Sequence, residues 1–568
     1  MNPETKQCQN CKQNFVIEPE DFLFYEKIKV PPPTFCPKCR LQRRLAFLNI
    51  FNLFSRQCDL CKKDILAIYA KDAPYKVYCP SCWWSDKWDW ASYGRDYDFS
   101  RPFFEQFNEL LHEVPHISLY IDSPTLINSQ YVNFAGSQKN TYLLFMTDSV
   151  ENTAYGFYLN HVKDSLDSSA IVSSELCYDS MHSYKNSHCV GLRSQVTDSV
   201  DCAFLKDCFN CQNCIASANL HNKQYYIFNK PYSKDGYTKE KERWDLGSYK
   251  DYQELKRLAE EHWKKFPPKP VQEEFSVNSS GSHVFRSRNC KQCFEVTGGE
   301  DSKYLFWLYD PPIKDCYDIS TWGNNLSLSY ECSNVGEHSS NLKFSMGSGI
   351  NIYDAEYTFA ALSSSHIFGS AWMRKGEYII LNKRYSKEEY ETLREKIIKH
   401  MDEMPYKDKK GNIYRYGEFF PIELSPQAYN QTIANYFFPL SRDEIGNYGY
   451  KHRETEMRKH DVTIATNNIP DHIKDVSDSI LKEVLQCGEC GKGFRIIPME
   501  LQFLRRRSLP LPRKCPFCRI EEKFKLWVRN LRMVLRVCSR CGAHFETKYT
   551  EAEASIVYCK ECYQKEFL

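Results

Sequence analysis

The sequence predicts a multidomain, mainly β protein with a duplicated, parallel β-helix-like solenoid in the middle, short bracing helices, and a small cysteine-rich module at each end. Three observations predict this fold class. Cys-x-x-Cys pairs gather at both ends of the chain, and the middle is rich in Ser, Asn, Tyr, Val and Cys with short β-prone runs. Two stretches of that middle also end in nearly the same residues, which indicates an internal duplication.

Length and composition set the frame for this prediction. The chain has 568 residues, of which 42% are hydrophobic and 26% charged, and this balance is typical of several globular domains. It contains no apolar run long enough to cross a bilayer, so we expect no membrane association. The start, MNPETKQC, does not resemble a secretory signal, so we expect a cytoplasmic protein. In that compartment the 26 cysteines are metal ligands or buried thiols rather than disulfides.

The N-terminal module (1–95) and the C-terminal module (487–568) carry four Cys-x-x-Cys pairs each. In both modules 24 residues lie between the first two pairs and 17 between the last two. The pairs are Cys8/Cys11, Cys36/Cys39, Cys58/Cys61 and Cys79/Cys82 in the first module, and Cys487/Cys490, Cys515/Cys518, Cys538/Cys541 and Cys559/Cys562 in the second. We therefore predict one two-site module, of the zinc-ribbon or treble-clef kind, that occurs twice.

Two such pairs suit a tetrahedral Zn(Cys)4 site, because each tight turn points two thiolates at one ion. Four protein ligands leave no open position, so we predict four structural Zn²⁺ ions, with iron as the alternative metal. His544 lies close to Cys541 and is either a substitute ligand or an ordinary surface histidine. A proline follows Cys36 and Cys515, which predicts that the second pair opens a helix in each module.

The two solenoid repeats are predicted at 125–237 and 275–386. The first ends in YYIFNKPYSKDGY and the second in EYIILNKRYSKEEY. Asp-Ser pairs recur at 148, 164, 179 and 198, at irregular intervals that are compatible with stacked coils. A β-sandwich is the alternative. Ten cysteines lie in this region, and they either stack as buried thiols or form a fifth metal site; among them are Cys208, Cys211, Cys214, Cys290 and Cys293.

Three further segments connect these parts. We predict a helical connector at 96–124, a helical brace or linker at 238–274, and a helical and aromatic connector at 387–486. Ser386 followed by Glu389 predicts a capping box at the start of a helix.

The whole set of motifs resembles an uncharacterised family of multi-zinc-ribbon proteins from candidate-phylum bacteria with small genomes. The segments that carry the resemblance are EDFLFYEKIKVPPPTFCPKCRLQRR (20–44), CPSCWWSDKWD (79–89), LNKRYSKEEYE (381–391), YGEFFPIELSP (416–426) and LPLPRKCPFC (509–518). They cover nearly the whole chain. The resemblance implies zinc-ribbon modules and no particular activity.

Basic residues beside the cysteine pairs suggest nucleic-acid binding. Residues 1–95 contain 15 Lys and Arg against 10 Asp and Glu, and residues 487–568 contain 17 against 9. Phosphate contacts are predicted at Arg40, Arg43, Arg44, Arg505, Arg506, Arg507, Arg513, Lys514, Arg519 and Lys523. The alternative for these arginines is a solvated helix face. Trp83, Trp84, Trp88 and Trp90 either stack on bases or pack in the module core.

Together these patterns predict a non-catalytic zinc-binding protein that binds RNA or DNA or serves as an interaction scaffold. The alternative is a scaffold for protein partners alone, without nucleic acid. An enzyme acting on polysaccharide is a third hypothesis, supported only by what other β-helices do, because the sequence shows no distinguishable pair of catalytic carboxylates.

Overall fold

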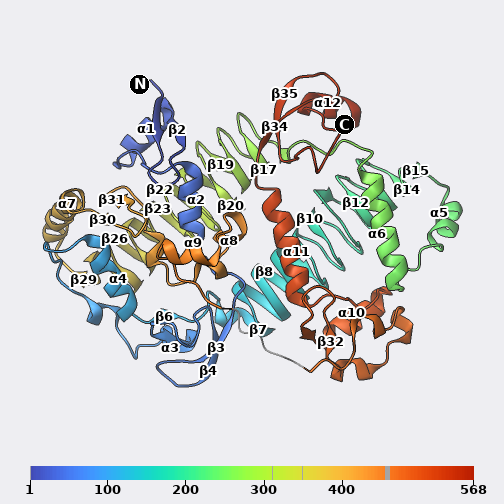
Figure 1. The fold of residues 1–568 in the computed structure, drawn as a ribbon, viewed down its shortest axis with the longest axis horizontal. Coiled ribbons are helices and arrows are strands. Elements are labelled where there is room, and N and C mark those ends of the chain that lie inside the picture. The colour runs from blue at the N-terminus through green and yellow to red at the C-terminus, as the bar shows by residue number, and fades with distance from the viewer. Residues whose placement is uncertain (1, 310, 348, 455–460, 568) are drawn as a thin grey trace. The chain divides into compact units, whose positions relative to one another are not determined.

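The computed structural model describes residues 2–309, 311–347, 349–454 and 461–567 (Figure 1). The chain divides into two compact units, each built from two separate stretches of sequence. Unit 1 contains Met1–Leu119 and Glu273–Glu454, and unit 2 contains Tyr120–Gln272 and Thr455–Leu568. Each unit therefore combines one cysteine-rich module with the solenoid repeat that is more distant from it in the sequence.

The centre of unit 2 is a parallel β-solenoid. Leu126 pairs with Gln138 and Leu159 with Ile171, so these coils take twelve residues each. The stacked strands are β7 (Leu126–Gln130), β8 (Asn133–Lys163), β9 (Ser169–Val172), β10 (Met181–Tyr184), β11 (Val196–Thr197), β12 (Ala203–Lys206), β13 (Gln212–Ala218) and β14 (Gln224–Ile227).

Unit 1 contains the second solenoid, which has slightly longer coils. Gly281 pairs with Cys293, twelve residues on, whereas Gly323 pairs with Gly336, thirteen residues on. Its parallel strands are β16 (Glu273–Glu274), β17 (Gly281–Phe285), β18 (Cys293–Thr297), β19 (Gly299–Glu300), β20 (Phe306–Leu308), β21 (Ile313–Tyr317), β22 (Gly323–Tyr330), β23 (Gly336–Lys343), β24 (Ile352–Glu356), β25 (Phe359–Leu362), β26 (Ser364–Phe368), β27 (Ala371–Arg374) and β28 (Glu377–Ile380).

The coils are tight because the chain turns at every third residue. In one coil of unit 2 these corner residues, all with positive φ, are Asp164, Asp167, Ala170 and Ser173. Four corners give each coil four short sides. The residue after each corner is buried. In this coil these buried residues are Ser165, Ser168, Ile171 and Ser174. Small or branched residues fit this narrow interior, and the core of each solenoid is a stack of such residues.

Buried serines satisfy the backbone between coils. Ser165 Oγ donates to Lys163 O at 2.8 Å and accepts from the N–H of Cys177, one coil later, at 3.1 Å. The parallel ladders confirm the solenoid and exclude the β-sandwich alternative. The Asp-Ser intervals were wrong as a guide to the coil, because the coils of the first solenoid repeat every twelve or thirteen residues and these pairs fall at different positions around them.

Both solenoids end in the same way, which supports the duplication. β14 is followed by β15 (Lys230–Pro231) and β28 by β29 (Lys383–Arg384), each as an antiparallel hairpin. Asn229 caps the last coil of unit 2 through two hydrogen bonds to the backbone of Ala218, and Asn382 caps that of unit 1 through two bonds to Ala371.

Helices follow these hairpins. Unit 2 has α5 (Lys234–Lys241) and α6 (Tyr249–Trp263), and α6 packs on β12 and β13. Unit 1 has α7 (Lys387–Glu403), which begins with the predicted capping box of Ser386 and Glu389. No helix among the described residues is long and apolar enough to span a membrane.

The cysteine-rich modules consist of short hairpins and helices. The N-terminal module contains β1 (Glu4–Gln7), β2 (Asn14–Ile17), α1 (Pro19–Lys27), α2 (Pro37–Leu45), β3 (Phe54–Gln57), β4 (Asp64–Ala67), β5 (Val77–Tyr78), α3 (Pro80–Trp83) and η1 (Trp90–Tyr93). The C-terminal module contains β32 (Leu485–Gln486), β33 (Gly493–Phe494), α10 (Pro498–Arg507), α11 (Pro516–Arg529), β34 (Val534–Val537), β35 (His544–Thr547) and α12 (Lys560–Phe567).

The connectors are helical only in part. The segment 96–124 contains α4 (Phe103–Glu113) and β6 (His116–Ile117), and residues 455–460 of the last connector lie outside the described part of the chain. The remaining short elements are η2 (Ser123–Thr125), β30 (Tyr406–Lys407), β31 (Ile413–Tyr414), η3 (Ile422–Leu424), η4 (Tyr429–Gln431), α8 (Ala434–Phe437), α9 (Arg442–Asn447), η5 (Thr466–Asn468), η6 (Ile473–Asp475) and η7 (Asp478–Lys482).

Candidate metal centres and binding surface

The structure brings all the paired cysteines together in four clusters of four. In each cluster the sulfur atoms lie within 4.8 Å of one another. Each cluster contains the two pairs that the spacing predicts. The clusters of unit 1 are Cys8, Cys11, Cys36 and Cys39, and Cys58, Cys61, Cys79 and Cys82; those of unit 2 are Cys487, Cys490, Cys515 and Cys518, and Cys538, Cys541, Cys559 and Cys562.

The first pair of each cluster lies on a tight hairpin turn. The N–H of Lys12 donates to Cys8 O at 3.0 Å, and Lys12 has a φ of 60°. The corresponding residues of the other turns, also with positive φ, are Lys62, Gly491 and Gly542. Glycine adopts this conformation at little cost, which explains its use in both turns of the C-terminal module.

The second pair lies at the start of a helix, as the prolines predict. Cys36 caps α2 and Cys515 caps α11. The N–H of Cys36 donates to Cys8 Sγ at 3.3 Å, and the N–H of Cys515 donates to Cys487 Sγ at 3.2 Å. The same bond forms in the other two clusters. Such bonds and the positive end of the helix stabilise thiolates.

The clusters have the chemistry of closed metal sites. Burial opposes ionisation of the thiols and raises the pKa of Cys515 to about 11. At the first cysteine of each cluster in the C-terminal module, hydrogen bonds from backbone N–H groups outweigh burial and lower the pKa of Cys487 to about 7 and that of Cys538 to about 6. Four thiolates complete a tetrahedral coordination sphere and leave no position for a substrate, so these residues fit a structural ion. His544 is exposed at the start of β35, and the fourth cluster forms from cysteines alone.

Three of the predicted nucleic-acid contacts are buried in unit 1. Arg40 Nε lies 2.8 Å from Asp318 Oδ2, Arg43 Nη2 lies 2.6 Å from Glu331 Oε1, and Arg44 Nη1 lies 3.1 Å from Asp318 Oδ1. The three arginines are at most 2% exposed. Their guanidinium groups are paired with carboxylates of the solenoid, so they hold α2 on the coils and offer no exposed cation to a phosphate.

Unit 2 repeats this contact with α11. Arg519 forms ion pairs with Asp167 of the solenoid and with Glu500 of α10, and Lys523 Nζ lies 2.9 Å from Asp179 Oδ1. Arg519 and Lys523 occupy the positions in α11 that two of the buried arginines occupy in α2. They are buried as well, so the prediction of phosphate contacts also fails for them on grounds of access.

The other five predicted basic residues lie nearer the surface of unit 2. The side chains of Arg505, Arg506 and Lys514 are 40%, 52% and 40% exposed, and each has an acidic neighbour within 4 Å. Arg507 and Arg513 donate to backbone carbonyls of His188 and Pro470. Nucleic-acid binding by this cluster stays a prediction.

The tryptophans of the N-terminal module are mostly core residues. Trp83, Trp88 and Trp90 are buried, and each indole N–H donates to a backbone carbonyl. Trp84 is 54% exposed. Only Trp84 is therefore accessible enough to stack on a base without a change in packing.

The ten central cysteines are buried inside the coils. Cys177 Sγ donates to Glu175 O at 3.4 Å, in the way that Ser165 Oγ donates to Lys163 O in the preceding coil. Within the described part of the chain, none of these cysteines belongs to a group of clustered metal-ligating atoms. They behave as small core residues.

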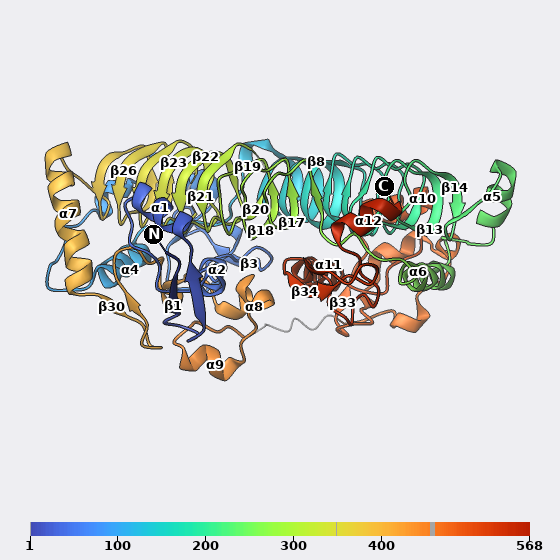
Figure 2. The same ribbon diagram turned by 90° about the horizontal axis from the view of Figure 1, so that it is seen from above.

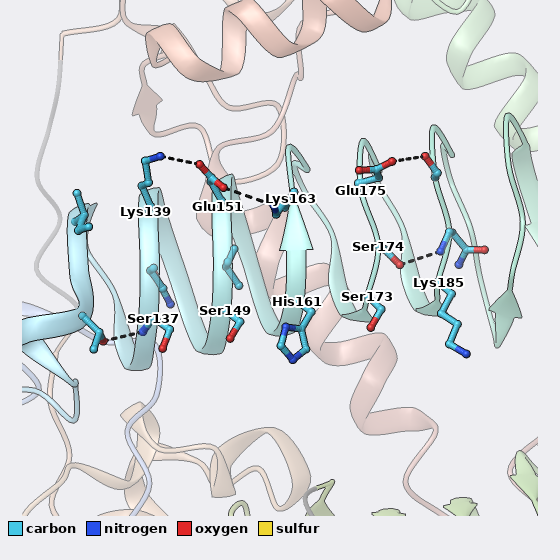
Figure 3. Close-up of a pocket in the computed structure, with 16 residues that line it drawn as sticks. Ser137, Lys139, Ser149, Glu151, His161, Lys163, Ser173, Ser174, Glu175 and Lys185 are labelled. Carbon is cyan, nitrogen blue, oxygen red and sulfur yellow. Dashed lines mark hydrogen bonds and ion pairs between the residues drawn. The ribbon is translucent and has the colours of Figure 1, made fainter.

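A shallow groove on the first solenoid was not predicted from the sequence. It has a volume of about 660 Å³ and crosses six coils of unit 2. Figure 3 shows its two rows of side chains, which repeat once per coil. The outer row is Ile127, Lys139, Glu151, Lys163, Glu175 and Ser187, and the corner row is Thr125, Ser137, Ser149, His161, Ser173 and Lys185. A search of the sequence for polar residues that recur at intervals of twelve could have found both rows.

The second solenoid has a groove of about 650 Å³ at the corresponding positions around its coils. Its corner row is Asn351, Ser363 and Lys375, and its outer row is Tyr353, Ser365 and Glu377. Counted back from the capping asparagines Asn229 and Asn382, these rows continue the same two columns as those of the first solenoid.

Comparison with known proteins gives little guidance. No protein-family model matches the chain, and no curated protein matches it. A solved structure described as a putative acetyltransferase from Desulfovibrio desulfuricans G20 is similar over 51% of this chain and 85% of its own, with 9% sequence identity and a TM-score of 0.09. A likeness this weak carries no argument about fold or activity.

Proposed function

We propose that the protein is a non-catalytic binding scaffold in which four structural zinc ions fold two modules, and each module braces one solenoid. The observation that carries the proposal is the matched docking of α2 and α11. In each unit the helix that begins at a metal-ligating pair inserts its cations into carboxylates of the solenoid, such as Arg40 at Asp318 and Arg519 at Asp167. The metal therefore organises the helix that holds the coils.

Zinc is the metal that we propose for all four clusters. Sets of four cysteines on tight turns are typical of structural zinc, and ligands of this kind also bind iron. Elemental analysis of the purified chain tests this directly. We expect four zinc ions per chain; iron in place of zinc, or fewer than four ions after purification without chelators, contradicts the assignment.

The sequence resemblance to multi-zinc-ribbon proteins of candidate-phylum bacteria supports the same proposal. Their shared features, the paired cysteines and the NKRYSKEEYE segment, lie in the metal clusters and at the end of the second solenoid. Membership of that family is part of the proposal.

Nucleic-acid binding is the second candidate, and the partly exposed cations of the C-terminal module favour it. Arg505, Arg506 and Lys514 lie in one module and keep at least 40% of their side chains exposed. A salt titration of binding to RNA and DNA tests it. If the triple variant R505A/R506A/K514A binds as tightly as the unchanged chain at low salt, this candidate is wrong.

A further inference from the structure

One side of each solenoid carries rows of polar side chains, and the zinc module reaches the corner where this side ends, through Arg506 at Asp164 in unit 2 and Lys27 at Asp315 in unit 1. In one coil of unit 2 this side, which we call the ladder side, runs from the corner at His161 to the corner at Asp164. The opposite side begins at Asp167, which binds Arg519. Phe157, one coil earlier on that opposite side, packs on Phe524 of α11.

The two ladder sides share a sequence of charges. In unit 2 the outer row contains, after Ile127, the residues Lys139, Glu151 and Lys163. Lys139 Nζ lies 3.0 Å from Glu151 Oε1 and Lys163 Nζ lies 3.9 Å from Glu151 Oε2. In the corresponding coils of unit 1 the row reads Arg288, Glu300 and Lys314, with Glu300 2.5 Å and 3.1 Å from its two neighbours. We call each set a charge triad.

The triads are also alike in exposure. The four cationic side chains are between 51% and 64% exposed, and the two glutamates are 32% and 33% exposed. The pairing of Arg288 with Glu300 and of Glu300 with Lys314 along the strands places the members on consecutive coils. Two cations thus stand two coils apart on each ladder side, with an acceptor between them.

The shape and lining of the ladder side suit a polymer better than a small molecule. Pockets for small ligands are enclosed and mostly apolar, whereas these grooves are shallow and lined mainly by Ser, Lys, Glu and Asn. The same kinds of groups return on every coil, about 4.8 Å apart, so a ligand with a short repeat of polar groups can use them many times.

The spacing of the charges indicates which class of polymer the ladder side can bind. Cations two coils apart, about 9.5 Å, favour a ligand with negative charges at wide intervals. Each cation already neighbours a glutamate, so a single-stranded nucleic acid would find no strongly positive track. The exposed rings of the corner rows, His161 and Phe275, do not recur from coil to coil as a platform for stacked bases requires. An added peptide strand requires a sheet edge, which the side of a coil does not offer.

We propose that the ladder side of each solenoid binds an extended acidic polysaccharide. Carboxylates of the ligand lie on the two cations of the charge triad, and its hydroxyls bind the glutamate between them and the Ser and Asn side chains of the rows. This inference rests on the proposed scaffold function, because it takes the side opposite the zinc module as the one left for a ligand.

The test is a binding measurement with the full, zinc-loaded chain. The probes are an oligosaccharide of hyaluronan, in which every second sugar carries a carboxylate, an oligogalacturonate, a neutral cello-oligosaccharide and oligo(dT). We expect the acidic saccharides to bind, with affinity that increases with their length, and the neutral saccharide to bind at least about tenfold more weakly.

Variants locate the site. The pair K139A/K163A in unit 2 together with R288A/K314A in unit 1 should weaken acidic saccharide binding by at least about tenfold. A matched control, K239A/K241A, removes two exposed lysines of α5 and should change nothing. The pair E151Q/E300Q releases the cations from their carboxylate neighbours and should not weaken binding.

Three results would overturn the inference: no binding of either acidic saccharide, binding of oligo(dT) alone, or unchanged saccharide binding after removal of the four cations. Each of these leaves the scaffold proposal standing if elemental analysis gives four zinc ions. Absence of zinc, in contrast, removes the scaffold proposal whatever the saccharides do, so the two failures are distinguishable.

Discussion

The two units contain the same kinds of elements, but different residues hold the helix of the cysteine-rich module on the solenoid. In unit 1, α2 brings three arginines to Asp318 and Glu331; in unit 2, α11 brings Arg519 and Lys523 to Asp167 and Asp179. Figure 2 shows each of the two helices beside the coils of its own unit. The acidic partners are corner residues one coil apart in both cases. What the two units preserve is thus one equivalent pair, Arg40 with Asp318 and Arg519 with Asp167, and the position of both acidic corners, while the other cations differ in number and in partner.

This comparison shows what a module with two four-cysteine clusters contributes. A helix of nine residues such as α2 is too short to be stable alone, and a cluster of buried arginines would be unfavourable without partners. The metal site fixes the start of the helix and the solenoid supplies the carboxylates. Neither part accounts for the contact without the other.

The largest effect is expected when one metal site is removed from each unit. C36S should disrupt the first cluster of unit 1 and C515S the corresponding cluster of unit 2. Structural zinc contributes about 10 to 16 kcal/mol of folding free energy, so each variant should lose one zinc ion and unfold its module. Hydrogen exchange with mass spectrometry should then show faster exchange in 275–386 for C36S and in 125–237 for C515S.

C177S is the control for these two variants. Cys177 is a buried core thiol at a position where the preceding coil has Ser165, so its replacement by serine should keep four metal ions and normal exchange. If C36S instead loosens 125–237, the repeat that lies next to its module in the sequence, the pairing of modules and solenoids is wrong.

The second prediction concerns the buried cations themselves. R40A leaves Asp318 buried with one partner fewer, and R519A does the same to Asp167. Loss of one partner of a buried ion pair costs about 3 to 5 kcal/mol, and we expect a destabilisation of this size in each unit by denaturant unfolding. R505A, which removes a 40% exposed arginine, should change stability by less than about 0.5 kcal/mol. Equal effects of R40A and R505A would contradict a docking role for α2.

The metal clusters could be predicted from the sequence because their signal is local. The Cys-x-x-Cys turns recur with equal spacing in both modules, and each turn by itself brings two sulfurs to one point. The pairing of each module with the distant solenoid repeat left no such trace, because contacts such as Arg40 with Asp318 join residues far apart in the chain. For the same reason, Arg40 and Arg519 were predicted from the sequence to be exposed residues that contact phosphate.

The solenoid was predicted from composition, but its repeat was not. The informative pattern is the buried residue after every corner, such as Ser165, Ser168, Ser174 and Cys177, which gives a period of three within a coil of twelve. Asp-Ser pairs drew attention to a longer, irregular interval. A period of three resembles neither the alternation of an ordinary strand nor the repeat of an amphipathic helix, so a search for either pattern misses it.

The equivalent acidic corner residues Glu331 of unit 1 and Asp179 of unit 2 are expected to respond differently to pH. Burial raises the pKa of Glu331 in unit 1 to about 7, whereas for Asp179 in unit 2 burial is outweighed by Arg193, Lys256 and Lys523, which hold its pKa well below the ordinary value. A raised carboxyl pKa favours the folded state at low pH, and this contribution, at most about 3 kcal/mol, is lost as the pH rises toward 7.

E331Q should therefore flatten the dependence of unit 1 stability on pH between about 5 and 7, measured by hydrogen exchange in 275–386. D179N is the matched variant in unit 2. The contribution of Asp179 is lost only as the pH falls below the ordinary range of an aspartate, so D179N should destabilise unit 2 equally at both ends of this window. A pH slope that E331Q leaves unchanged would contradict the role of Glu331.

The smallest effect is expected at the ends of the solenoids. Asn382 is fully buried and makes a further bond, at 3.3 Å, to Trp90 O of η1, whereas Asn229 is only partly buried. Each N-to-A variant leaves the backbone N–H and carbonyl of the last coil without their partner, at a cost of about 1 to 3 kcal/mol. Because water can reach the exposed end in unit 2 but not the buried one in unit 1, N382A should cost more than N229A. Equal losses of unfolding free energy in N382A and N229A would contradict this role of burial at the end of the solenoid.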